Sequence, residues 1–207
     1  MSSNRKTAIA VAVLFLTSTV TFGIGSFLIN SYFTAHDPSR TLLTTGVLLE
    51  SYCAVAVAGI GFLMLPILRK FSNRLAFGYA VLRTIEGTVI VASGIYLLAV
   101  LKLVQHYDLV TFVFTAIGGL TLSYLLYQSR LVPRILSALG IFGYAALLLG
   151  VILNAFSVVN INSGAGNAFL VPGGLFEVAL PIWLLVKGFN ASVIASKSTP
   201  ARLIRAA

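Results

Sequence analysis

Four ionisable residues interrupt otherwise apolar stretches of the sequence: Glu50, Arg83, Glu86 and Glu177. A charged side chain in such a stretch costs about 2.5–3.5 kcal/mol on insertion scales if it faces lipid. We therefore expect all four side chains to face the interior of a helical bundle, one another, or water. Because intramembrane charges mark proton relays, ion paths and ligand counter-ions, these residues are the first candidates for a functional site.

The spacing of Arg83 and Glu86 predicts that the two side chains meet, because residues three apart share one face of a helix. Tyr79 belongs to the same stripe. We also expect Arg83 to contact at least one of Glu50 and Glu177. One arginine cannot neutralise three carboxylates, and burial favours the neutral acid. At least one of Glu50 and Glu177 is therefore expected to carry a proton, or to have a cation or water beside it.

The depth of these residues in their segments suggests a common cavity. At 1.5 Å per residue, Glu177 lies about 9 Å and Glu50 about 12 Å from the outer ends of their segments, and Glu86 lies near the middle of its own. Asn154 lies at outer depth as well. We expect the three glutamates to line a polar cavity open to the outside, with Arg83 at its floor. The candidates for ligand or proton binding are Glu50, Tyr79, Arg83, Glu86, Asn154 and Glu177.

The elements that position these residues follow from the composition. Of the 207 residues, 58% are apolar and only 9% are charged, whereas an ordinary soluble domain carries about 25% charged residues. Such a chain is too apolar for a soluble or a disordered protein. Six segments have the length and apolarity of spanning helices. They are residues 7–33, 42–68, 76–101, 109–128, 135–158 and 171–189.

The connections and charges predict an all-α, multi-pass membrane protein with a single domain over residues 1–207. No connection is long enough for a soluble domain, and residues 190–207 form a basic tail. If the N-terminus is cytoplasmic, eleven Lys and Arg residues lie on that side and two on the other. This bias predicts that both termini are cytoplasmic. The net charge of +9 is then a topology signal, and we expect no nucleic-acid partner.

The residue inventory argues against most catalytic chemistry. Cys53 is the single cysteine, and both histidines, His36 and His106, fall in polar connections. The spans therefore lack a Ser–His pair, histidines at metal-ligand spacing and a phosphate-binding loop. An intramembrane enzyme ranks last among the functions considered, and neither a metal nor a cofactor is expected.

Several short segments together resemble a known family. They are YAVLRTIE at 79–86, SRLVPR at 129–134, Phe176-Glu177, and WLLVKGF at 183–189. In this order they are similar to the bacterial six-helix membrane family catalogued as domain of unknown function 4386. The resemblance covers nearly the whole chain. It implies a multi-pass protein of the bacterial plasma (inner) membrane, and no established activity.

Two functional interpretations remain open. In the first, the buried Glu/Arg cluster binds or transports a small ligand, coupled to a cation or proton. In the second, the protein is a non-catalytic structural or accessory membrane protein whose buried charges only fix helix packing. The partners expected are the lipid bilayer and, in the first interpretation, a small cationic ligand or a proton. A homo-oligomer is compatible with either.

Overall fold

The structure, a computed structural model, describes residues 3–37, 39–102 and 108–196. The described residues do not include His106 or the end of the basic tail from residue 197, which contains Lys197, Arg202 and Arg205. Six helices are long and apolar enough to cross a membrane. They are α1 (Ser3–Thr34), α2 (Arg40–Leu68), α3 (Asn73–Val100), α4 (Leu109–Ser129), α5 (Arg134–Ala155) and α6 (Val171–Val186). The all-α, six-helix prediction is confirmed.

Two helices end earlier than the hydropathy pattern predicts. Helix α5 ends at Ala155 and is followed by Ser157 with φ 58°. Helix α6 ends at Val186, where Gly188 takes φ 74° and its N–H points back to the carbonyl of Trp183. A left-handed residue, usually glycine, commonly ends a helix in this way. The backbone thus stops the helices although the apolar sequence continues.

Two short helices were not expected from the sequence. A 3-10 helix, η1 (Gly164–Phe169), leads into α6 and makes a span of 23 residues together with it. Helix α7 (Ala191–Ser196) follows α6 and begins the basic tail. Neither is long enough or periodic enough to stand out from the sequence pattern.

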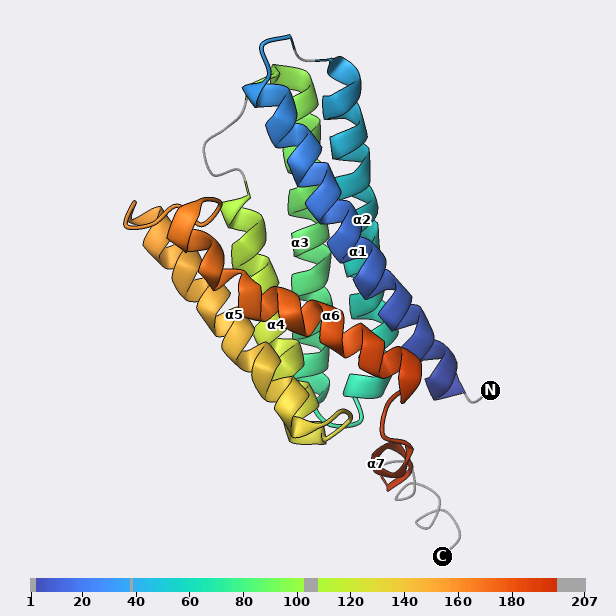
Figure 1. Cartoon of the computed structure of the whole chain (residues 1–207). Coiled ribbons are helices and arrows are strands. Elements are labelled where there is room, and N and C mark those ends of the chain that lie inside the picture. Colours follow the sequence, from blue (N-terminus) through green and yellow to red (C-terminus); the bar gives the residue numbers. More distant parts are fainter. Residues whose placement is uncertain (1–2, 38, 103–107, 197–207) are drawn as a thin grey trace, which may run out of the picture.

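The six spans form a closed ring, in which each packs against the next and α6 packs against α1 (Figure 1). Helices α1 to α3 are longer than α4 to α6 and extend beyond them at the end remote from the termini. The 32 residues of α1 correspond to about 48 Å, well above the roughly 30 Å of a hydrocarbon core. In a membrane, α1 must therefore tilt or project from it.

Close helix packing relies on glycine, as two contacts between backbones illustrate. A Cβ on Gly25 of α1 would lie 2.8 Å from the carbonyl oxygen of Gly46 on α2. A Cβ on Gly143 of α5 would lie 2.6 Å from the backbone nitrogen of Gly173 on α6. Only glycine permits these approaches, as is typical of membrane helix pairs.

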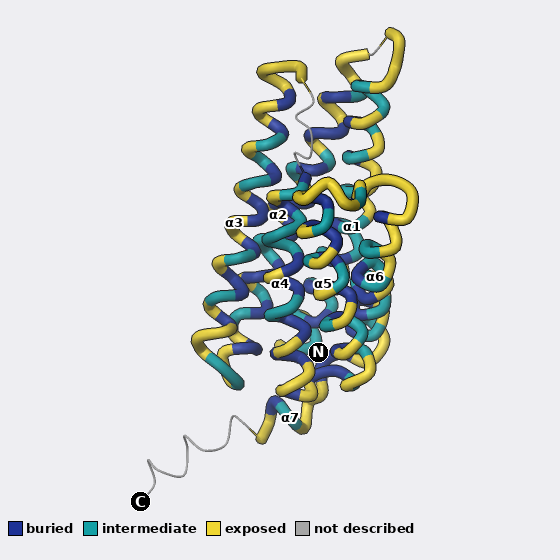
Figure 2. Tube along the Cα trace, turned by 90° about the vertical axis from the view of Figure 1, so that its left-hand side faces the viewer, coloured by how far each residue is buried: buried dark blue, intermediate teal, exposed yellow. Residues whose placement is uncertain are grey.

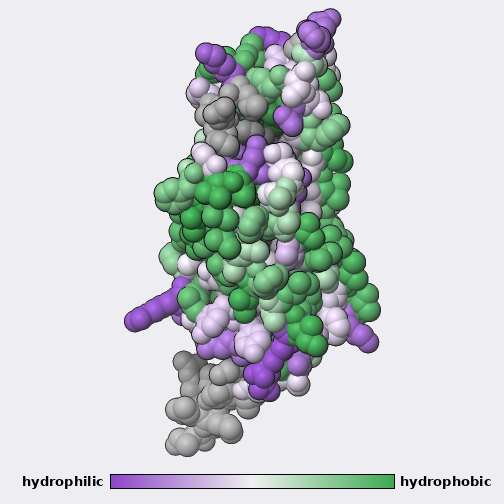
Figure 3. All heavy atoms as spheres, turned by 60° about the vertical axis from the view of Figure 1, so that its left-hand side comes forward, coloured by the Kyte–Doolittle hydropathy of each residue, from purple (hydrophilic) through white to green (hydrophobic). Residues whose placement is uncertain are grey.

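The exterior of the ring is apolar, as a bilayer requires. Buried residues face inward along the tubes of Figure 2, whereas Phe27, Val55, Phe62 and Ile135 are more than half exposed. Hydrophilic residues gather toward the two ends of the molecule in Figure 3, with a broad apolar belt between them. Both ends of the described chain lie at the same end of the ring, together with the α2–α3 and α4–α5 connections (Figure 1).

Candidate functional site

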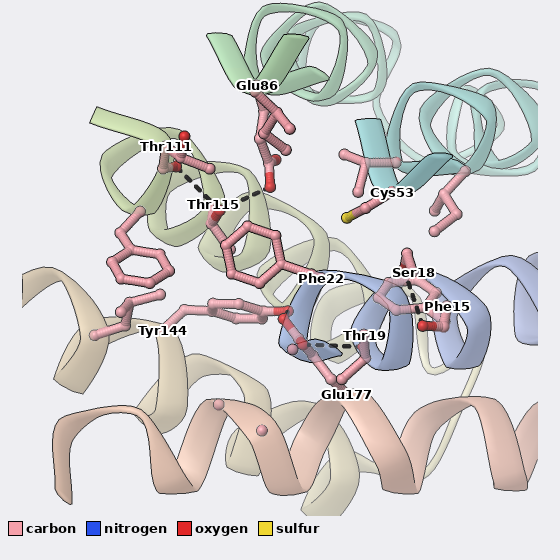
Figure 4. Close-up of a pocket in the computed structure, with 18 of the residues that line it drawn as sticks. Phe15, Ser18, Thr19, Phe22, Cys53, Glu86, Thr111, Thr115, Tyr144 and Glu177 are labelled. Atoms are coloured by element: carbon pink, nitrogen blue, oxygen red, sulfur yellow. Dashed lines mark hydrogen bonds between the residues drawn. The ribbon is translucent and has the colours of Figure 1, made fainter. Parts of the chain in front are cut away.

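A cavity of about 400 Å³ lies inside the ring, and all six spanning helices contribute to its wall. Its ionisable residues are Arg83, Glu86 and Glu177, accompanied by Cys53 and by hydroxyl side chains. Figure 4 shows side chains from opposite sides of the ring converging on this space. The remaining wall is mainly aliphatic and aromatic. It comprises Phe15, Phe22, Val57, Ile60, Ile90, Phe112, Leu147 and Leu170, with Gly23, Gly173 and Gly174.

Arg83 and Glu86 form a buried salt bridge on α3. The guanidinium Nη1 lies 2.7 Å from Glu86 Oε2, and both residues are almost fully buried. Thr115 on α4 donates a hydrogen bond of 2.7 Å to Glu86 Oε1. Arg83 Nε donates to the hydroxyl of Tyr79, one turn earlier, at 3.3 Å. The predicted Arg83–Glu86 pair is confirmed, and its charges cancel locally.

Glu177 on α6 is held by hydroxyl groups. Tyr144 of α5 donates a hydrogen bond of 3.0 Å to Oε1, and Thr19 of α1 donates one of 3.2 Å to Oε2. The side chain is partly exposed, on the cavity wall. We expected Arg83 to contact Glu50 or Glu177 as well as Glu86. At Glu177 the structure instead provides two neutral donors, and Arg83–Glu86 is the salt bridge formed among the described residues.

The cavity is closed toward the end of the ring where the termini lie. On that side the helices are packed by fully buried apolar side chains. These include Ala8, Val11, Leu68, Ala76, Leu126 and Leu184. Toward the other end, Gly23 of α1 and Gly174 of α6 line the cavity, and a Cβ on either would meet nothing within 4 Å. At these two glycines of α1 and α6, here called the Gly23–Gly174 gap, the cavity wall has space for a side chain, and we take this gap as its more open side.

Three predicted site residues, Glu50, Asn154 and Tyr79, are not among the described residues that line the cavity. Glu50 is buried at the contact of α2 with α1, where its Cγ is 2.9 Å from the position of a Cβ on Gly25. Asn154 accepts a hydrogen bond of 2.8 Å from the backbone of Ile161 and so anchors the α5–α6 connection. The expectation that Glu50 lines the cavity is corrected: this residue packs at the close α1–α2 contact instead. Tyr79 is fully buried behind Arg83.

Six polar wall residues were missed or undervalued from the sequence: Ser18, Thr19, Cys53, Thr111, Thr115 and Tyr144. Threonines in membrane helices commonly bond their own backbone, as Thr115 does to the Thr111 carbonyl. Their presence in a span is therefore a weak signal. Tyr144 could have been found from its place four residues after Gly140, on a packed face of α5.

The comparison with known families gives a match over nearly the whole chain. The model of the family described as Domain of unknown function (DUF4386) matches residues 8–110 and 107–188. None of the curated proteins and none of the solved structures searched is significantly similar to the chain. The matched residues include α1 from residue 8 onward, the other five spanning helices and every ionisable residue of the cavity. The chain therefore belongs to the DUF4386 family of multi-pass membrane proteins.

Proposed function

We propose that the protein binds, within the membrane, a small and mainly apolar molecule that carries one cationic group. The observation that carries this proposal is Glu177, a carboxyl group on the wall of an apolar cavity whose partners are the Tyr144 and Thr19 hydroxyls. A carboxylate in such surroundings attracts a cation, because an uncompensated charge in a low-dielectric site is costly.

The charge balance of the cavity supports a cationic ligand over an anionic one. Arg83 is already bonded to Glu86, so the pair contributes no net charge. Glu177 then leaves the site one negative charge in excess when it is ionised. In the empty protein a proton on Glu177 removes that charge, and a bound cation takes the place of the proton.

The shape of the cavity supports a compact ligand with a large apolar part. A volume of about 400 Å³ lies in the range of small-molecule sites, which combine apolar walls with few polar groups. Phe15, Phe22 and Phe112 provide aromatic surface for such a ligand. Because the cavity is packed shut on one side, the geometry favours binding from the open side.

The charge distribution supports an orientation in the bacterial plasma membrane. The described Lys and Arg residues of the N-terminus, of the α2–α3 and α4–α5 connections and of the end of α6 gather at one end of the ring. The positive-inside rule assigns that end to the cytoplasm. In this orientation the Gly23–Gly174 gap faces the outer half of the bilayer.

A matched pair of probes tests the proposal: 4-phenylbutylamine, a cation at neutral pH, and 4-phenylbutan-1-ol, its neutral counterpart. The purified protein in a nonionic detergent is melted with each compound. We expect the amine to raise the melting temperature in a saturable way, and more than the alcohol does. Equal effects, or none from either compound, would contradict the proposal and favour a purely packing role for the buried charges.

A further inference from the structure

A second pocket, of about 450 Å³, lies at the end of the ring where the termini are found, between the α4–α5 connection and the end of α6. Three cations line it: Arg130, Arg134 and Lys187. The other walls are residues 131–133 and 188–190 and the indole of Trp183. It is separate from the central cavity, with which it shares no lining residue.

The backbone around this pocket is tied together. Arg130 ends α4 with φ 55°, and its N–H donates to the Leu126 carbonyl. The N–H of Asn190, beyond the end of α6, donates a hydrogen bond of 2.9 Å to the carbonyl of Leu131. The guanidinium of Arg134 lies 5.3 Å from the ring centre of Tyr127. These contacts hold cationic residues from two parts of the chain around one concave surface.

The positive charge of this pocket has no acidic side chain to offset it. The chain has five Asp and Glu residues. Glu50, Glu86 and Glu177 lie within the spans, and Asp37 and Asp108 lie in connections at the opposite end of the ring. The side chains of Arg130, Arg134 and Lys187 are exposed. The topology rule explains positive charge at this end, but not its convergence on a pocket that also contains a tryptophan.

We infer that this pocket binds the phosphate group of an anionic ligand. Arginine presents a planar set of donors that matches phosphate oxygens, and lysine adds a mobile point charge. Basic pockets between spanning helices suit anionic lipid head groups at the membrane surface. Trp183, at the end of α6, is placed to contact the glycerol or upper acyl part of such a lipid. A soluble phosphate compound would present the same chemistry to the three cations.

The test compares phosphate sources on the purified full chain in a nonionic detergent. The melting temperature is followed while phosphatidylglycerol, phosphatidylcholine or inorganic phosphate is added. We expect saturable stabilisation by phosphatidylglycerol beyond that by phosphatidylcholine if the source is a lipid, and by inorganic phosphate if it is soluble. Either result supports the inference and identifies the source. No stabilisation by phosphatidylglycerol beyond phosphatidylcholine, together with no effect of inorganic phosphate, would overturn it.

Matched variants separate a pocket from a general attraction of charge. The double variant Arg130→Gln/Lys187→Gln removes two cations from the pocket. The control Lys6→Gln/Arg74→Gln removes one lysine and one arginine that are exposed at the same end and do not line it. We expect the pocket variant to bind about tenfold more weakly or worse, and the control to bind like the unmodified protein. Equal losses in both variants would reduce the effect to diffuse electrostatics and overturn the inference.

Discussion

Tyr144 on α5 and Glu177 on α6 are joined across the cavity wall by a hydrogen bond of 3.0 Å. The tyrosine ring is fully buried, stands edge-on to Phe176 at 5.7 Å between centres, and packs directly over Gly119. The hydroxyl is therefore fixed before any ligand arrives. The hydrogen bond from the neighbouring helix holds the Glu177 carboxyl group in one orientation. Because the side chain is already ordered, ligand binding costs less conformational entropy.

The Tyr144→Phe variant removes this donor and keeps the ring. A typical hydrogen bond contributes about 0.5–1.5 kcal/mol, so we expect a small loss of stability in thermal melts of the purified protein. Tyr124→Phe, at a half-exposed position on α4, is the matched control and should leave the melting temperature unchanged. A Tyr144→Phe protein as stable as the control would show that the bond to Glu177 contributes nothing.

The Arg83–Glu86 pair predicts a larger effect from breaking one side than from removing both. Arg83→Ala leaves Glu86 buried without its cation, a loss of about 3–5 kcal/mol in buried pairs. Glu177→Gln is expected to be milder, because glutamine mimics the neutral acid. Adding Glu86→Gln to Arg83→Ala should recover part of the stability. If Glu177→Gln lowers the melting temperature as much as Arg83→Ala does, the role of Glu177 is that of a structural anion.

The Gly23–Gly174 gap predicts a variant that blocks the cavity without harming the fold. A Cβ at Gly174 would meet nothing within 4 Å, and leucine has a higher helix propensity than glycine. We expect Gly174→Leu to fold normally and to lose the stabilisation that 4-phenylbutylamine gives. Gly78 on α3 also faces open space but does not line the cavity, so Gly78→Leu should keep that stabilisation. If the two variants respond alike, the ligand does not pass or occupy this gap.

The sequence was informative about which residues are in the membrane, and less so about what they face. The cost of a charge in lipid correctly predicted that Arg83 and Glu86 are buried together. The same reasoning placed Glu50 in the cavity, whereas Glu50 packs at the close contact between Gly25 and Gly46 and does not line the cavity. That contact depends on how two helices cross, which hydrophobic periodicity does not specify.

The polar side of the cavity was the least predictable part. Thr19 and Tyr144 reach Glu177 only because α1 closes the ring against α6 and α5 packs beside it. The bond between Thr19 and Glu177 joins residues that are 158 positions apart in the chain. Asn154 was expected at the site because of its depth, but it bonds the backbone of the following connection. A short-range cap and a ligand contact look alike in a sequence.

The orientation in the membrane has its own test. In a Cys53→Ala background, single cysteines are introduced at Ser72, between α2 and α3, and at Ser163, between α5 and α6. The charge bias predicts that a membrane-impermeant maleimide labels Ser163→Cys in intact cells, and labels Ser72→Cys only after the cells are broken. The reverse pattern would place the termini outside and invert the proposed entry side.

The central claim is that Glu177 receives the cationic group of a ligand, and isothermal titration of the purified protein with 4-phenylbutylamine tests it most directly. We expect saturable binding that Glu177→Gln weakens about tenfold or more, because hydrogen bonds to charged groups contribute about 1.5–3 kcal/mol. Glu50→Gln changes a buried glutamate outside the cavity wall and should bind like the unmodified protein. Equal affinities for the unmodified protein and a folded Glu177→Gln, or no binding to either, would contradict the account.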